Sequence, residues 1–411
     1  MEKNFNPNTN ERREIIAAAT EIFKHRFYSP TFDGLNVDAV LSERISDLLA
    51  TDAFATQLTD VFAISGARPI EVFHESERTL PLARVLKATL FETVEREYLF
   101  RDVLVGGRAR QAGIESGDRL VSVNGAAPNS EHVRVHAHRA VEIVVESKAG
   151  STRTLSYPAP SSERPNPEHN VEFQKLADDI GHIRIASWPG ILGIEIARET
   201  DAAIRALRCK RLIVDLRGNF GSVGAGNLRI MSYFTPDRIP VGYSLTRRRA
   251  EDGYDRESLP RFERIPRWEI QGVPILWKFR KLDKSIVVVT EGLGRQAFHG
   301  NIVLLVNRHT ISGAEIVVQF AKEHDLAVIV GERTAGRSLS FGTFQLPYDF
   351  RFTFPIGDYI PWSGPRFEGA GIEPDVFAQF ERSREGHADE ELSTAMQVVR
   401  SNATLKQAAR R

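Results

Sequence analysis

The chain has 411 residues, more than one hydrophobic core usually organises, so we expect two or three domains. Its 54 Lys and Arg side chains balance 54 Asp and Glu, and this zero net charge argues against a general nucleic-acid binder. No window holds the apolar run of about eighteen residues that a membrane span requires. The single cysteine, Cys209, allows no internal disulfide and no thiolate metal site within one chain. Residues 1–30 lack the apolar core and cleavage site of a secretory signal, which predicts a cytoplasmic protein, or a periplasmic one if a leader was removed.

The first part of the chain has the pattern of helices. Apolar residues recur at spacings of three and four through 11–27, 37–50 and 53–64. We therefore assign residues 1–97 to an N-terminal helical region.

Shorter alternating segments follow. They predict strands separated by Gly, Asn and Ser turns, at 100–105, 119–125, 140–147 and 152–157. A Pro- and Ser-rich stretch at 158–167 is typical of a linker. These features predict a second domain over 98–158.

From about residue 182 onward, strands and helices alternate, as in an α/β domain with a largely parallel sheet. Residues 388–410 have the pattern of a last helix. The predicted fold is multi-domain α/β, with an α/β core over 159–411.

The segment GGRARQAGIESGDRLVSVNG, at 106–125, resembles the second half of a PDZ domain of the kind embedded in bacterial peptidases. PDZ modules bind extended chains by adding a strand to a sheet edge. A PDZ-like module with a closed or merely structural groove is the alternative.

Glycines follow a buried strand in LIVDLRGNFGSVGAG, at 212–226. At a strand-to-helix turn, glycines let backbone N–H groups point at a phosphate or at a developing oxyanion. Neither the dinucleotide nor the P-loop glycine pattern is present.

Ser312 lies between another buried strand and the helix that begins at residue 313. The commonest use of serine at this position is an N-cap. The alternative is a nucleophile at the positive end of the helix dipole.

Four motifs in chain order, L-R-G-N-x-G, S-G-A-E-I, V-G-E-R-T-A-G and IPWSGPRFEGAGIEPDV, resemble the C-terminal-processing and tricorn-type serine peptidases, which also include interphotoreceptor retinoid-binding protein modules. The resemblance extends from about residue 50 to 378. It implies that Ser312 is the nucleophile of S-x-x-E, with Glu315 three residues later. It also implies that Gly221 and Gly313 donate to the oxyanion.

At the positions where the two branches of that family have their general base, this sequence has other residues. The lysine of the processing branch is Arg337 here, and a guanidinium group keeps its proton. The tricorn-like branch has a Ser-His pair, supported by a late glutamate; Ser65 and Glu368 match its serine and glutamate, but Gly66 stands where the histidine is expected. We consider His74 as a substitute base, while His309 and Lys322 have the pattern of a turn residue and a solvated helix lysine.

The predicted function is a serine peptidase that cleaves extended or C-terminal peptide segments, with Ser312, Glu368, His74 and Ser65 as candidate catalytic residues. The alternatives are a catalytically silent family member that binds peptides or small apolar ligands, and a hydrolase of non-peptide acyl substrates. No metal or organic cofactor is indicated. We expect a peptide or protein substrate, no nucleic acid and no membrane span, and leave assembly into a homo-oligomer open.

Overall fold

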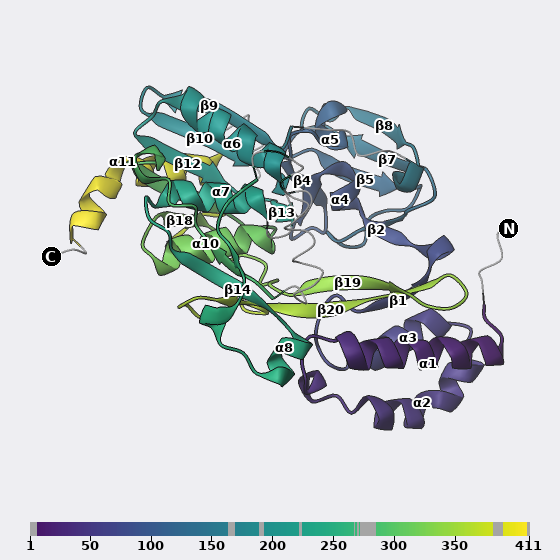
Figure 1. The fold of residues 1–411 in the computed structure, drawn as a ribbon. Helices are drawn as coiled ribbons and strands as arrows, with labels where there is room; N and C mark the ends of the chain where they lie inside the picture. Colours follow the sequence, from purple (N-terminus) through teal and green to yellow (C-terminus); the bar gives the residue numbers. More distant parts are fainter. Residues whose placement is uncertain are drawn as a thin grey trace.

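The computed structural model describes residues 6–162, 169–188, 193–221, 224–266, 268, 271, 285–380 and 389–408. Three large sheets and their covering helices make up most of these residues, as Figure 1 shows. The predicted linker lies partly outside the described residues, from 163 to 167. Across the described residues, every helix is too short or too polar to cross a membrane.

Three helices open the chain: α1 (Thr9–Arg26), α2 (Val37–Ala50) and α3 (Phe54–Ala63). Their apolar faces share one buried cluster with Phe352 and Phe354, from a strand almost three hundred residues away. The helices therefore cover one face of the sheet that contains β1 (Glu71–His74) and β20 (Phe350–Pro361), as Figure 1 shows. The predicted helices within residues 11–64 are confirmed.

The core sheet has the order β21-β18-β17-β12-β10-β9. Its strands are β9 (Val171–Ala177), β10 (Ile180–Ile185), β12 (Arg211–Asp215), β17 (Asn301–Val306), β18 (Val328–Gly331) and β21 (Val376–Phe377). All pairings are parallel except that of β9 with β10. The predicted parallel sheet is confirmed.

Helices cover both faces of this sheet. They are α6 (Ile194–Leu207), α7 (Ala225–Phe234) and α10 (Gly313–Glu323) on one face and α11 (Glu390–Ala408) on the other. Side chains that alternate along β12 separate the two faces, because Leu212 and Val214 join the cluster under α6, α7 and α10, whereas Ile213 joins the cluster with α11.

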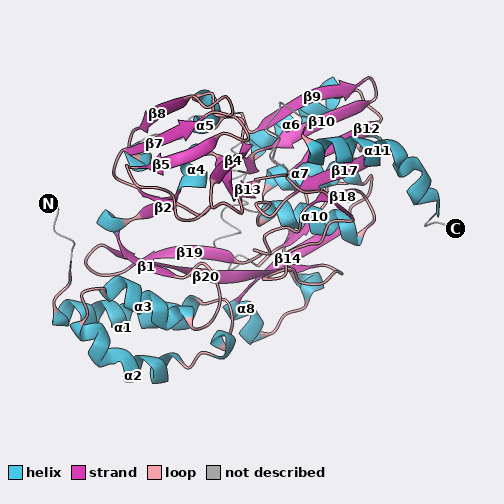
Figure 2. Ribbon diagram, turned by 180° about the vertical axis from the view of Figure 1, so that it is seen from behind, coloured by secondary structure: helices cyan, strands magenta, loops and turns pink. Residues whose placement is uncertain are grey.

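A five-stranded sheet lies beside the core (Figure 2), in the order β3-β4-β5-β7-β8. Its strands are β3 (Ala88–Glu92), β4 (Tyr98–Val103), β5 (Arg119–Val123), β7 (Val141–Glu146) and β8 (Thr152–Tyr157), with the short helices α4 (Leu82–Leu86) and α5 (Arg108–Gln111) packed on it. We call residues 82–157 the small module. The predicted boundary at residue 98 falls inside the β3–β4 hairpin, so this sheet includes residues that the sequence analysis placed in the helical region.

A second six-stranded sheet was not predicted. It is built around β20 (Phe350–Pro361), which pairs with β1 (Glu71–His74), β14 (Pro240–Thr246) and β19 (Ser340–Gln345). Its remaining strands are β15 (Arg261–Phe262) and β16 (Val287–Val289). The short elements elsewhere are β2 (Thr79–Pro81) with β6 (Arg134–His136), β11 (Ser187–Trp188) with β13 (Phe220–Gly221), and helix α8 (Arg247–Asp252).

Candidate active site

Ser312 occupies a strained turn between β17 and α10. Its φ of 57° and ψ of −110° lie outside the regions that residues other than glycine usually adopt. An ordinary N-cap is extended, as at Asn8 before α1, where φ is −70°, ψ is 171° and the side chain accepts from Asn10 and Glu11 N–H. Such a conformation costs about 1–3 kcal/mol and is typical of a nucleophile on a sharp strand-to-helix turn. The backbone at Ser312 therefore differs from that of a simple helix cap.

Glu315 ties Ser312 to a second loop. Its carboxylate accepts from the N–H groups of Ser312 at 3.0 Å, Gly336 at 2.6 Å and Arg337 at 2.9 Å, and from the Thr334 hydroxyl at 2.6 Å. The side chain is fully buried, which raises its pKa, while these four donors favour the charged form. The S-x-x-E spacing thus builds a bracket that joins the start of α10 to the loop at 334–337.

The glycine-containing loop that leads to Gly221 lies against the start of α10. Ile311 N–H donates to Asn219 O at 3.0 Å, which joins the residue before Ser312 to the loop that leads to Gly221. Gly221 has φ 146°, and a Cβ there would lie 2.6 Å from Trp188 O, so close approach of β11 requires glycine. Gly313, the other predicted oxyanion donor, is the first residue of α10. The two glycines thus belong to segments that hydrogen bonds hold together.

Within the described part of the chain, the side-chain hydrogen bonds of Glu368 go to the loop after Arg337 rather than to a histidine. It accepts from Ser338 N–H and from the Ser338 hydroxyl at 3.0 Å, and from Leu339 N–H at 3.1 Å. Arg337 itself is exposed, and its N–H is bound by Glu315. The two predicted family glutamates therefore fix the backbone on both sides of the position at which the processing branch has its lysine.

The proposed substitute base is part of a strand rather than a rearranged loop. His74 ends β1 and is in register with Phe350 of β20, and its Nδ1 lies 2.7 Å from Ser76 Oγ. Ser65 lies in the turn after α3, where its hydroxyl donates to Phe62 O at 3.0 Å. Gly66 has φ 78°, a left-handed conformation that favours glycine over histidine. These contacts give Ser65 and His74 local roles and provide no contact with Ser312.

The two less favoured candidate bases, Lys322 and His309, lie in different environments. Lys322 Nζ donates to Glu373 O at 2.6 Å and lies 3.1 Å from Asp375, at the surface. His309 is buried, and burial lowers its pKa. Its Nε2 has no hydrogen-bond partner among the described residues.

Asn307 and Asp102 are not among the predicted site residues. Asn307, at the end of β17, donates from Nδ2 to Asp102 Oδ2 at 2.9 Å, although the two residues are 205 positions apart. The position of Asn307 directly after a buried strand is a signal that could have identified it, because carboxyl ends of parallel strands carry functional residues. Asp102 has no comparable signal in the sequence.

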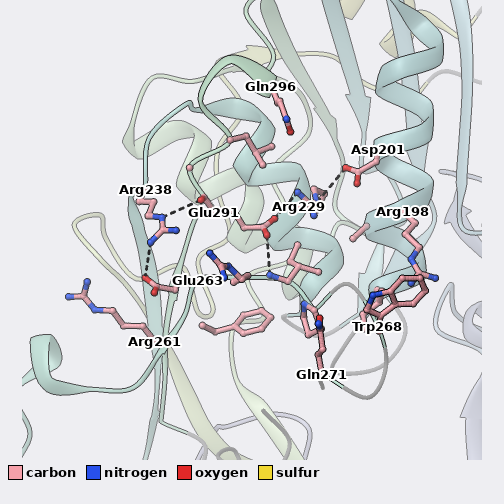
Figure 3. Close-up of a pocket in the computed structure, with 18 of the residues that line it drawn as sticks. Arg198, Asp201, Arg229, Arg238, Arg261, Glu263, Trp268, Gln271, Glu291 and Gln296 are labelled. Atoms are coloured by element: carbon pink, nitrogen blue, oxygen red, sulfur yellow. Dashed lines mark hydrogen bonds and ion pairs between the residues drawn. The ribbon is translucent and has the colours of Figure 1, made fainter. Parts of the chain in front are cut away.

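A hollow of about 1410 Å³ lies elsewhere, over α6 and α7 (Figure 3). Arginines and carboxylates line it together, and Arg229 pairs with Glu291 at 2.8 Å. None of the predicted site residues lines this hollow. It is therefore separate from the candidate active site. The described residues also contain no group of three or more His, Cys, Asp or Glu side chains arranged for a metal.

Comparison with known proteins finds similarity to one peptidase family. Residues 179–378, which contain β12, β17, Ser312 and Glu368, match the model of peptidase family S41. This segment of the chain is similar to peptidase family S41. The family resemblance predicted from the sequence is thereby confirmed.

The individual relatives are distant in sequence. A carboxyl-terminal-processing protease of Picosynechococcus sp. is 21% identical over 284 residues, covering 66% of this chain and 58% of the relative's length. The carboxy-terminal processing protease CtpA of Bacillus subtilis is 23% identical over 371 residues, covering 88% of this chain and 68% of that protein. The solved photosystem II D1 C-terminal processing protease has a TM-score of 0.58 at 16% identity, covering 94% of this chain and 97% of that one. At this identity the similarity establishes the shared α/β multi-sheet fold, which confirms the predicted fold class.

Proposed function

We propose that this S41 protein is a serine-type peptidase in which Ser312 attacks the scissile carbonyl. The observation that carries the proposal is the strained backbone of Ser312 at the strand-to-helix turn. The strain persists because Glu315 bonds both Ser312 N–H and the loop at 334–337, and strain held in this way is typical of functional sites. Ser312 is also half-buried rather than sealed in the core, so a substrate can reach it.

The oxyanion would be stabilised by backbone N–H groups of Gly221 and Gly313. Both glycines lie next to the start of α10, whose N-terminus carries partial positive charge. A donor pair of this kind typically contributes a factor of about 10² to 10³ per donor to kcat. Glu368 would act on the loop that carries Arg337, rather than on the base directly.

The substrate we propose is an extended or C-terminal peptide segment captured through the small module. The module has a sheet with helices α4 and α5 packed on it, and its 106–125 segment resembles a PDZ domain. Strand addition to such a sheet binds main chain irrespective of most side chains. This supports a protein substrate rather than a small-molecule one.

A catalytically silent peptide carrier is the second candidate. Arg337 replaces the lysine of one family branch and Gly66 the histidine of the other, so both known base positions lack a proton acceptor. A carrier would keep the fold and the module while turning over nothing.

Peptide turnover separates the two candidates. The purified chain and its Ser312→Ala variant are incubated with an unfolded protein and with a short activated ester, and products are identified by mass spectrometry. A peptidase cleaves the protein and the ester, and Ser312→Ala loses both activities. A carrier binds the unfolded protein equally well with either residue at position 312 and cleaves nothing, a result that would rule out the proposed peptidase.

A further inference from the structure

The side-chain amide of Asn307 joins the two halves of the candidate active site. Its Oδ1 accepts from Gly218 N–H at 3.2 Å, in the loop that continues to Gly221, and from His309 N–H at 3.0 Å, in the turn that continues to Ser312. Asn307 is completely buried, so no water competes for these bonds. One amide oxygen therefore holds the predicted oxyanion loop and the nucleophile turn together.

An amide group can rotate by half a turn and exchange its oxygen with its nitrogen, so something must fix which end faces the two N–H donors. Asp102 of β4 has this role, because its Oδ2 accepts from Asn307 Nδ2 at 2.9 Å. A carboxylate can only accept, so the nitrogen must face Asp102 and the oxygen must face Gly218 and His309.

Asp102 is itself held in place. Its Oδ2 also accepts from Thr89 Oγ1 at 2.6 Å, and its Oδ1 lies 3.5 Å from Arg184. Burial opposes the charged form, but Arg101 and Arg184 keep the pKa of Asp102 below its ordinary value. The backbone also packs closely here, because a Cβ on Gly218 would lie 2.7 Å from Asp102 Cβ. The carboxylate is thus charged, buried and fixed against the oxyanion loop.

We propose that Asp102, a residue of the small module, is a positioning residue for Ser312 that acts by orienting the Asn307 amide. The inference rests on the proposed function, since it treats Ser312 as the nucleophile. It also gives the module a role in assembling the active site in addition to peptide capture. Two further contacts join the small module to the turn after β17. Arg308 pairs with Glu131 of the module at 2.6 Å and lies 5.0 Å from the ring of Phe91, also in the module.

The test exchanges the two groups. Asn307→Asp keeps an acceptor for the N–H groups of Gly218 and His309. It also places a second carboxylate against that of Asp102, and the repulsion between the two negative charges should displace the turn that carries residue 307. The double variant Asp102→Asn with Asn307→Asp reverses the donor and the acceptor and restores both the hydrogen bond and the total charge. Glu172→Gln is the matched control, since it removes the Arg110–Glu172 ion pair between the module and the core, 2.7 Å and largely exposed, without contacting Asn307.

Two readouts are compared for the four proteins: amide hydrogen exchange of the peptides that contain 215–221 and 307–316, and the rate at which a fluorophosphonate labels Ser312. We expect Asn307→Asp to exchange faster in both peptides and to be labelled at least about tenfold more slowly, because small displacements of a nucleophile are costly. The double variant should return to within about threefold of the wild-type rate. Glu172→Gln should match the wild type in both readouts.

The proposal is overturned if Asn307→Asp exchanges like the wild type, or if the double variant is no better than the single one. Exchange does not require catalysis, so the two proposals can fail separately. A wild type that is never labelled, but whose two peptides respond to the substitutions as predicted, contradicts the proposed peptidase while the orienting role of Asp102 stands.

Discussion

The carboxylate of Glu315 accepts a hydrogen bond from the backbone N–H of Ser312, at a distance of 3.0 Å. The same carboxylate bonds the loop at Gly336 and Arg337, so a residue one helical turn after the nucleophile holds the nucleophile against a loop beyond β18. This arrangement fixes a strained serine within an otherwise ordinary strand-to-helix connection.

Glu315→Gln should destabilise the protein by about 2–3 kcal/mol, because glutamine offers one acceptor where four donors are buried, and its own N–H groups would face two of them. Chemical denaturation measures the change. Glu323→Gln, at the other end of the same helix and bonded to Gln319 at 2.9 Å, is the control and should cost less than about 0.5 kcal/mol. Equal losses for the two variants would mean that the bracket contributes no special stability.

Ser312→Gly should be more stable than Ser312→Ala by about 1 kcal/mol. Alanine keeps the cost of a φ of 57°, whereas glycine adopts this region freely. Glycine normally lowers stability relative to alanine by about 0.5–1 kcal/mol, so the expected order is the reverse of the usual one. Thermal unfolding of the two variants measures it, and an alanine variant that is the more stable would show that position 312 is unstrained.

Gly66→His tests whether a lost base limits activity. A Cβ at Gly66 would meet no atom within 4 Å, so only the left-handed backbone, with φ 78°, opposes the substitution. Gly66→Asn is the matched control, because asparagine tolerates this conformation and supplies no comparable base. If position 66 corresponds to the family histidine, kcat/KM for a short ester rises by about 10² or more in the histidine variant only. Equal rates for the two variants would place the missing base elsewhere.

The pH dependence of stability should have a contribution from Asp358. Burial raises its pKa from 3.8 to about 6, and nearby Glu368 adds to the shift while Arg366 opposes it. Between these values the native state holds a proton that the unfolded chain has released, so the free energy of unfolding falls as the pH rises from about 4 to about 6. Asp358→Asn should remove this fall and be more stable than the wild type by ~1–2 kcal/mol at pH 7 but not at pH 4.

Urea denaturation across this pH range provides the measurement. Asp38→Asn is the control, because Asp38 is an exposed partner of Lys24, with 72% of its side chain accessible. The free energy of unfolding of Asp38→Asn should follow the wild-type pH profile. An Asp358→Asn profile that is parallel to the wild type would contradict the raised pKa.

The core of the candidate site was predictable because its signals are local. A buried strand, a turn and an amphipathic helix predicted that Ser312 precedes the helix and that Glu315 lies in its first turn, as in the structure, and the glycines of 212–226 marked the neighbouring turn. Each of these patterns depends on residues that are close in the sequence. The sequence motifs therefore contained Ser312 and the loop at 334–337, which the Glu315 carboxylate joins.

The rest depends on contacts between distant segments. The pairing of β1 with β20 places Glu71 opposite Thr353, and no period within either strand specifies a partner so far along the chain. The same holds for Asp102 and Asn307, which form a polar contact across two sheets. Position 66 illustrates a third case, since the conformation that favours glycine there becomes visible only in the structure.

Labelling of Ser312 by a fluorophosphonate tests the central claim most directly, because the reagent reacts with an activated serine and requires no known substrate. The wild type, Ser312→Ala and Ser401→Ala are treated in parallel, and the modified peptide is located by mass spectrometry; Ser401 is an exposed serine on α11. We predict a single adduct at Ser312 in the wild type and in Ser401→Ala, and none in Ser312→Ala. An adduct that persists in Ser312→Ala, or a wild type that remains unmodified, would contradict the assignment of Ser312 as the nucleophile.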